Sequence, residues 1–119
     1  MLKIDPVTGE MMFFDYSLYG APYMRYGVVS REGQLVHEIP IDLPGCRAPH
    51  DITITEHYSI LHDFPLFHDV AVLREHGYRV TRFHRDLPSR FGVVPRRGGE
   101  DEIRWFEFEP GFVLHMVNA

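Results

Sequence analysis

Residues Pro49–Glu56 read Pro-His-Asp-Ile-Thr-Ile-Thr-Glu, with a histidine at the start of an alternating pattern. Ile52 and Ile54 fall on one side of an extended backbone, whereas the threonines between and after them fall on the other. This period of two predicts a strand over residues 50–56 with one buried face. His50 has the same parity as the two isoleucines, so we expect its side chain on that face.

Short extended segments separated by turns continue along the rest of the chain. Aromatic and β-branched residues concentrate in these segments, and Gly, Pro and Asp separate them. A turn over residues 5–10 has no predicted element before it, and a short helix is predicted over residues 67–75. Strands at a spacing of about ten residues indicate an all-β, antiparallel fold of the sandwich, barrel or propeller type. Strands are predicted over residues 10–18, 23–30, 35–41, 50–56, 58–61, 78–84, 90–96, 102–108 and 112–117.

The composition is that of a folded, mildly acidic protein. Of the 119 residues, 45% are hydrophobic and 24% are charged, and the formal net charge is −5. These values exclude a disordered chain and give no basic surface for nucleic acid. No apolar run approaches the ~18 residues of a membrane span, and the N-terminus lacks the apolar core of a signal peptide. A single cysteine excludes an internal disulfide, and we expect a cytoplasmic protein.

Both ends of the sequence suggest a piece of a longer protein. The chain stops within two residues of the strand predicted over residues 112–117, with no polar tail, and it starts beside the turn at residues 5–10. We therefore predict that residues 1–119 are a partial domain, truncated at both ends.

Two histidines are the candidate metal ligands, His50 and, 65 residues later (115 − 50), His115. His50 would stand where a proline-constrained loop meets a strand, a rigid place for a ligand. His115 stands in an apolar run, Phe112–Val117, where an imidazole needs a partner for its ring nitrogens. A metal ion is one such partner and a backbone carbonyl is another. Taken alone, each histidine fits an ordinary hydrogen-bonded strand residue better than it fits a metal ligand.

The remaining reactive side chains have weaker signals. The other six histidines lack the close spacing of a zinc or facial-triad motif, and we expect them on the surface or in loops. Cys46 has no second cysteine and no evident base, so we expect a bystander thiol. Arg90, Arg96 and Arg97 are expected to form ion pairs with the acidic residues at 100–102 across a hairpin loop. The six histidines are His37, His57, His62, His68, His76 and His84.

Several blocks of the sequence, in the right order, resemble the carotenoid cleavage oxygenase family. Residues 50–56 have the family's His-Asp-x-x-x-Thr-Glu pattern, and residues 63–65 have the Asp-x-Pro that follows it. The family's later blocks resemble residues 90–96, 103–107 and 112–119, and residues 5–10 fit the region before them. The stretch 67–85 matches least well. Residues 48–49 and 83–90 resemble bacterial lignostilbene-cleaving and related members more than plant enzymes.

This resemblance implies a seven-bladed β-propeller with a non-haem Fe(II) ion on its axis, bound by four histidines. His50 matches the second ligand and His115 the third, which places the first and fourth outside this chain. The implied reaction is oxidative cleavage of a conjugated carbon–carbon double bond by O₂, in a carotenoid, apocarotenoid or stilbene, to give two carbonyl products. The implied partners are an apolar substrate, O₂ and the missing remainder of the propeller. Peripheral membrane contact of the whole protein is left open.

Two other functions stay open at this point. A small, complete β-barrel of the cupin type would need a third ligand within the chain, and the sequence has no His-x-His. A catalytically silent β module that binds a partner would hold His50 and His115 far apart or on opposite faces.

Overall fold

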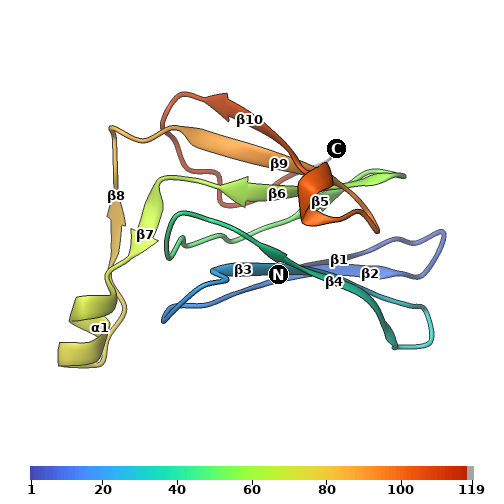
Figure 1. The fold of residues 1–119 in the computed structure, drawn as a ribbon, viewed down its shortest axis with the longest axis horizontal. Coiled ribbons are helices and arrows are strands. Elements are labelled where there is room, and N and C mark those ends of the chain that lie inside the picture. The colour runs from blue at the N-terminus through green and yellow to red at the C-terminus, as the bar shows by residue number, and fades with distance from the viewer. Residues whose placement is uncertain (118–119) are drawn as a thin grey trace.

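The computed structural model describes residues 1–117 and arranges most of them in two layers of antiparallel β-sheet (Figure 1). In each four-stranded sheet, neighbouring strands are also neighbours in chain order, apart from one insertion in the second sheet. The first sheet contains β1 (Leu2–Ile4), β2 (Met11–Tyr16), β3 (Met24–Val29) and β4 (Leu35–Ile41). The second contains β5 (Thr53–Ile54), β6 (Tyr58–Asp63), β9 (Ser89–Pro95) and β10 (Arg104–Phe108), with a short 3₁₀ turn, Glu100–Glu102, before β10.

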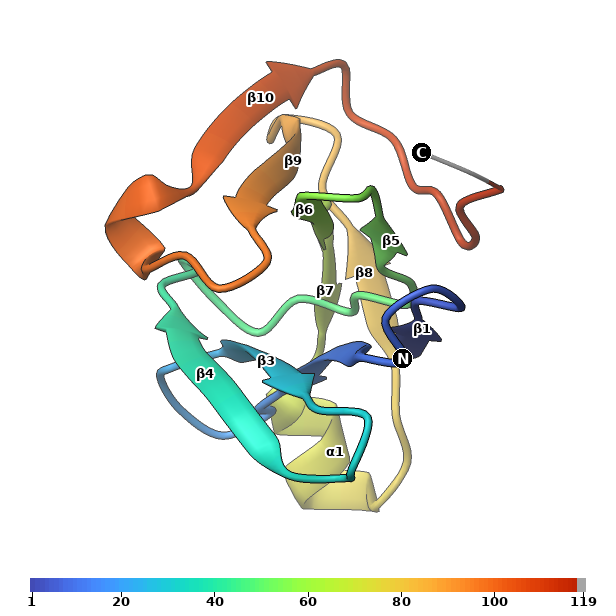
Figure 2. The same cartoon turned by 90° about the vertical axis from the view of Figure 1, so that its right-hand side faces the viewer.

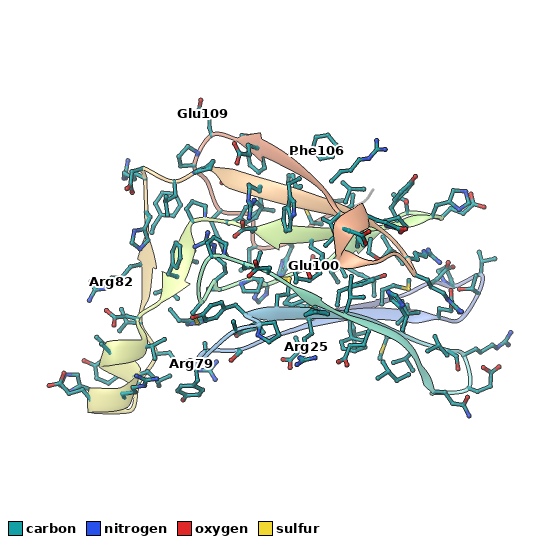
Figure 3. The ribbon with its side chains drawn as sticks, in the orientation of Figure 1. Arg25, Arg79, Arg82, Glu100, Phe106 and Glu109 are labelled. Carbon is teal, nitrogen blue, oxygen red and sulfur yellow. The ribbon has the colours of Figure 1, made fainter. Side chains whose placement is uncertain are left out.

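An insertion between β6 and β9 projects from one end of the two layers (Figure 1). It contains β7 (Leu66–His68), α1 (Val70–His76) and β8 (Thr81–Phe83), and β7 pairs with β8. Asp69 begins the helix by accepting a hydrogen bond from the Val72 amide, and Gly77 ends it with a φ of 75°. The predicted helix is confirmed, but it runs over Val70–His76 instead of residues 67–75, because residues 67 and 68 belong to β7 and Asp69 is the N-cap. Figure 3 shows Arg79 and Arg82 on this insertion.

The hydrophobic core lies between the two sheets. Met12, Met24 and Tyr26 of the first sheet are 0–1% exposed, as are Leu61 and Val94 of the second. The Tyr26 hydroxyl donates a hydrogen bond to the Arg96 carbonyl at 2.8 Å and contacts Ser59 Oγ at 2.8 Å, so a polar contact joins the layers as well. In the view of Figure 2, α1 of the insertion lies at the bottom and the last strand, β10, forms the upper edge of the second sheet.

Three strand predictions were wrong in ways that strand pairing explains. Residues 112–117 form no strand, because no segment of the described chain pairs with them. The strand predicted over residues 50–56 is reduced to Thr53–Ile54, the two residues that pair with β6. Leu2–Ile4, for which no element was predicted, forms β1 because it pairs with β2. No helix in residues 1–117 is long and apolar enough to cross a membrane.

Candidate metal centre

His50 and His115 lie next to each other in the structure. Their ring centroids are 5.1 Å apart and their planes are tilted by 45°. His50 is half-buried at the end of the loop from β4 to β5, and His115 is exposed in the segment that follows β10. The fold therefore brings together two side chains that are 65 residues apart (115 − 50), as a shared site requires.

The carboxylate of Asp51 lies between the two segments that carry these histidines. It follows His50 directly and is only 2% exposed. Its Oδ2 accepts a hydrogen bond from the Met116 amide at 2.8 Å, and its Oδ1 accepts one from the Ile52 amide at 2.9 Å. The Lys3 ammonium, on β1, lies 3.2 Å from Oδ1. Three parts of the chain thus meet at one side chain.

The surroundings of Asp51 keep its carboxylate ionised. Burial alone would raise its pKa, but the hydrogen bonds from the Met116 and Ile52 amides and from Lys3 outweigh burial. The pKa of Asp51 therefore lies below its ordinary value, and the negative charge is present at neutral pH.

The two imidazoles fit a shared metal ion in chemistry and in spacing. Imidazole nitrogen is a common donor to iron and zinc, and within residues 1–117 neither ring has a hydrogen-bond partner from the protein. Two imidazoles bound to one ion at about 2.1 Å have ring centroids roughly 4.5–5.2 Å apart for angles of about 90–110° at the ion. The observed 5.1 Å lies in this range. No group of three or more His, Cys, Asp or Glu side chains in the described residues could hold a metal, so these residues supply half of a four-ligand site at most.

A model of the RPE65 family, described as retinal pigment epithelial membrane protein, matches residues 2–119. The chain belongs to this carotenoid cleavage oxygenase family. It is 39% identical over 118 residues to a carotenoid 9,10(9',10')-cleavage dioxygenase of Crocus sativus, covering 98% of the chain and 21% of that protein. The chain thus spans about a fifth of the length of this relative.

Solved structures of the carotenoid cleavage oxygenase family have the same local fold. Lignostilbene dioxygenase of Pseudomonas brassicacearum superimposes with a TM-score of 0.76 at 36% identity, over 89% of this chain and 22% of that one. Cobalt-substituted apocarotenoid oxygenase of Synechocystis gives 0.68 at 26% identity, over 94% of this chain and 24% of that one. The two antiparallel sheets are therefore part of a carotenoid oxygenase β-propeller, which confirms the predicted fold class.

The geometry of the site disfavours both other functions that the sequence left open. A complete cupin-like site needs a third donor, and residues 1–117 bring none to the two histidines. A silent module would separate His50 from His115, whereas their rings are in contact.

The six other histidines differ in their environments. His57 and His76 are exposed, as predicted. The expectation was wrong for His62, which is 1% exposed in β6 between Phe64 and Phe91. β6 continues to Asp63, two residues beyond the predicted end, and His62 has the same parity as the exposed Tyr58. Alternation would therefore place His62 outside, and its burial comes from the rings of Phe64 and Phe91, which no alternating pattern signals. His37, His68 and His84 are half-buried.

Cys46 is a buried free thiol, whereas the predicted arginine ion pairs were assigned to the wrong carboxylates. Burial raises the pKa of Cys46, which keeps the thiol protonated. Arg96 contacts Asp5 at 2.6 Å and Arg97 contacts Glu10. Arg90 contacts Asp63 at 2.5 Å. These carboxylates lie far from residues 100–102 in sequence, so local spacing could not identify them.

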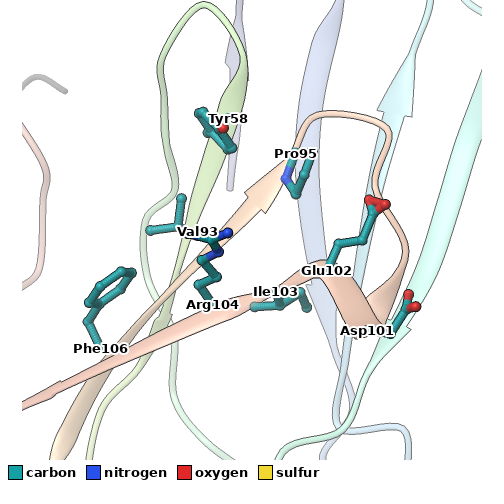
Figure 4. A pocket seen from close by; sticks show the side chains of 8 residues that line it. All are labelled: Tyr58, Val93, Pro95, Asp101, Glu102, Ile103, Arg104 and Phe106. Atoms are coloured by element: carbon teal, nitrogen blue, oxygen red, sulfur yellow. The ribbon is translucent and has the colours of Figure 1, made fainter.

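A groove of about 580 Å³ lies elsewhere, at the outer side of the second sheet (Figure 4). Its walls come from β6, β9, β10 and the 3₁₀ turn, and they do not include His50 or His115. We therefore assign no substrate tunnel to it. Its lining residues are Tyr58, Val93, Pro95, Asp101, Glu102, Ile103, Arg104 and Phe106.

Proposed function

We propose that this chain is the central part of a non-haem Fe(II) dioxygenase that cleaves a conjugated carbon–carbon double bond with O₂. The observation that carries the proposal is the pairing of His50 with His115 at 5.1 Å, in a chain of the carotenoid cleavage oxygenase family. The substrate class is a carotenoid, apocarotenoid or stilbene, as in the names of the similar proteins. The C=C and O–O bonds break and two C=O bonds form, so the reaction consumes no external reductant.

In this proposal His50 and His115 are the metal ligands, and Asp51 supports the backbone that carries them. His50 and His115 would hold an Fe(II) ion through neutral imidazole nitrogens, the metal that the family uses. When bound, this ion supplies the activation of O₂. Asp51 accepts backbone hydrogen bonds from Ile52 and Met116, which directly follow Asp51 and His115 in the chain.

We infer further that the two sheets are two neighbouring blades and that residues 112–117 open a third. In a propeller each blade pairs its own strands, so residues 112–117 would find their partners in the rest of that blade. The two remaining histidine ligands would come from other blades of the whole protein. The cytoplasmic location and the peripheral membrane contact of the whole protein stay predictions.

The experiment uses the full-length protein that contains this segment, purified without oxygen and supplied with Fe(II). Iron content is measured first, and a carotenoid, an apocarotenal and a lignostilbene are then incubated with the protein and O₂. We expect His50→Ala and His115→Ala to lose iron and to form no carbonyl products. His57→Ala, a change at an exposed histidine, serves as the matched control and should behave as the wild type. Unchanged iron content and cleavage in His50→Ala would refute the proposal.

A further inference from the structure

We propose that Asp51 is a positioning residue that sets the separation of His50 and His115 before any metal binds. This inference rests on the proposed function, because the two histidines matter as a pair only if they share a metal ion. Asp51 contacts neither a metal nor a substrate in this account. It acts through the backbone on either side of it.

The contact between Asp51 and Met116 controls the position of His115. Among the described residues, this is the one hydrogen bond that ties residues 112–117 to the rest of the protein. Upstream of it, the nearest polar anchor is Ser89 Oγ, which accepts a hydrogen bond from the Gly111 amide at 2.8 Å and donates one to the Gly111 carbonyl at 3.1 Å. His115 lies between these two anchors and directly beside the second.

The same carboxylate fixes the position of His50. The hydrogen bond from the Ile52 amide to Asp51 Oδ1, at 2.9 Å, holds the backbone at the start of β5. Because the two oxygens bind different segments, the distance between the His50 and His115 backbones is set across a single carboxylate. Its burial, at 2% exposure, shields both bonds from competing water.

An aspartate meets these demands and an asparagine does not. A carboxylate has two accepting oxygens, and here each one accepts from a backbone amide. In Asp51→Asn one oxygen becomes an NH₂ group, which cannot accept. Either the Met116 or the Ile52 amide then loses its partner, although the size of the side chain is unchanged.

The experiment uses NMR spectroscopy of the 119-residue chain, first without metal and then with Zn(II) as a probe that undergoes no redox chemistry. In the metal-free wild type we expect a slowly exchanging Met116 amide and a nuclear Overhauser contact between the His50 and His115 rings. In Asp51→Asn we expect Met116 exchange to be at least tenfold faster, the ring contact to weaken, and Zn(II) affinity to fall about 10- to 100-fold, the usual effect of removing a group that orients a ligand. Glu56→Gln, the same chemical change at an 88% exposed side chain in the same segment, should alter none of these readouts.

The outcomes separate this inference from the proposed function. Zn(II) affinity that is unchanged in Asp51→Asn but reduced in His50→Ala and His115→Ala would overturn the positioning role and leave the metal site standing. Affinity that is unchanged in all three variants would overturn the metal site itself. If Asp51→Asn does not fold, the wild-type measurement still decides, since a rapidly exchanging Met116 amide contradicts the inference.

Discussion

Two adjacent residues of β6, His62 and Asp63, are buried polar groups of opposite kinds. The ring of His62 packs against Phe64 and Phe91 at centroid distances of 4.8 and 5.5 Å, and neither ring nitrogen has a hydrogen-bond partner in residues 1–117. Asp63 instead lies between two arginines, 2.5 Å from Arg47 Nε and 2.5 Å from Arg90 Nη2. A buried group without a partner should stay neutral, and a buried charge with partners should be costly to remove.

The first prediction concerns acid stability and His62. Burial lowers its pKa from 6.5 to about 4, although the charge of Asp51 acts in the opposite direction. Between these two pH values the unfolded chain binds a proton that the folded chain does not. Stability from this residue is therefore fully present above pH 6.5 and declines as the pH falls towards 4, by about 3 kcal/mol in total. In urea unfolding from pH 7.5 to 4.5, His62→Leu should lose much less stability than the wild type.

The control for this prediction is His57→Leu, a change at a histidine whose side chain is 75% exposed. It should have the same pH dependence as the wild type. An acid sensitivity of His62→Leu equal to that of the wild type would assign the effect to other groups.

A second prediction concerns the charge of Asp63. Asp63→Asn leaves Arg47, which is 8% exposed, without its charged partner. We expect a loss of about 3–5 kcal/mol in the free energy of unfolding. Glu38→Gln breaks the exposed pair of Arg25 and Glu38, 3.9 Å apart, and should cost less than about 1 kcal/mol. Equal effects of the two changes in denaturant unfolding would contradict this account.

Each of the two four-stranded sheets has an aromatic ring that packs across a glycine of the neighbouring strand. Phe13 of β2 pairs with Gly27 of β3, and Trp105 of β10 pairs with Gly92 of β9. A Cβ atom added to Gly27 would lie 2.5 Å from Phe13 Cζ, and one added to Gly92 would lie 2.7 Å from Trp105 Cζ3. The missing side chain is what lets each ring pack flat against its partner strand.

The third prediction follows from this close approach in the second sheet. Gly92→Ala forces Trp105 away from β9, and with it the Arg90 guanidinium, which lies 4.4 Å from the centre of the Trp105 ring. We expect a loss of about 1–3 kcal/mol and a change in the tryptophan fluorescence. Gly20→Ala is the matched control, because an added methyl group there meets nothing within 4 Å. A stability of Gly92→Ala equal to that of Gly20→Ala would show that the strand tolerates the methyl group.

At the scale of the whole molecule, polar contacts of Tyr26 and Arg96 join the two sheets. The Tyr26 hydroxyl reaches Ser59 and the Arg96 carbonyl, both on the second sheet or its end. The Arg96 guanidinium donates to Asp5, in the turn after β1, and to the Thr55 carbonyl after β5. These contacts lie within the hydrophobic packing that the sheets share, so the two layers should unfold together.

The fourth prediction tests this coupling. Tyr26→Phe leaves Ser59 and the Arg96 carbonyl without their common partner, which should cost about 1–3 kcal/mol. Unfolding should stay a single transition when it is followed by far-ultraviolet circular dichroism and by Trp105 fluorescence. Tyr19→Phe, at a 66% exposed side chain, should change stability by less than about 0.5 kcal/mol. Two separate transitions in the wild type would show that the sheets are independent.

Local pattern was sufficient to predict the all-β architecture, and it failed where partners are distant in sequence. His50 and His115 were singled out as ligands by the family resemblance, and that assignment stays a prediction. The alternation in β6 and the caps of α1 are local, and those elements were predicted. The pairing of β1 with β2 and the unpaired state of residues 112–117 depend on which other segments are available, which no local pattern encodes. The burial of His62 and the hydrogen bond from Met116 to Asp51 depend in the same way on residues far along the chain.

An anaerobic Fe(II) titration of the 119-residue chain shows whether His50 and His115 share one metal ion. If they do, one ion should bind weakly per chain, without alkene cleavage. The NMR signals of the His50 and His115 rings should broaden together, at lower Fe(II) concentrations than those of the exposed His57 and His76. Independent broadening of the two rings, or tight binding that survives both His50→Ala and His115→Ala, would contradict a shared ion.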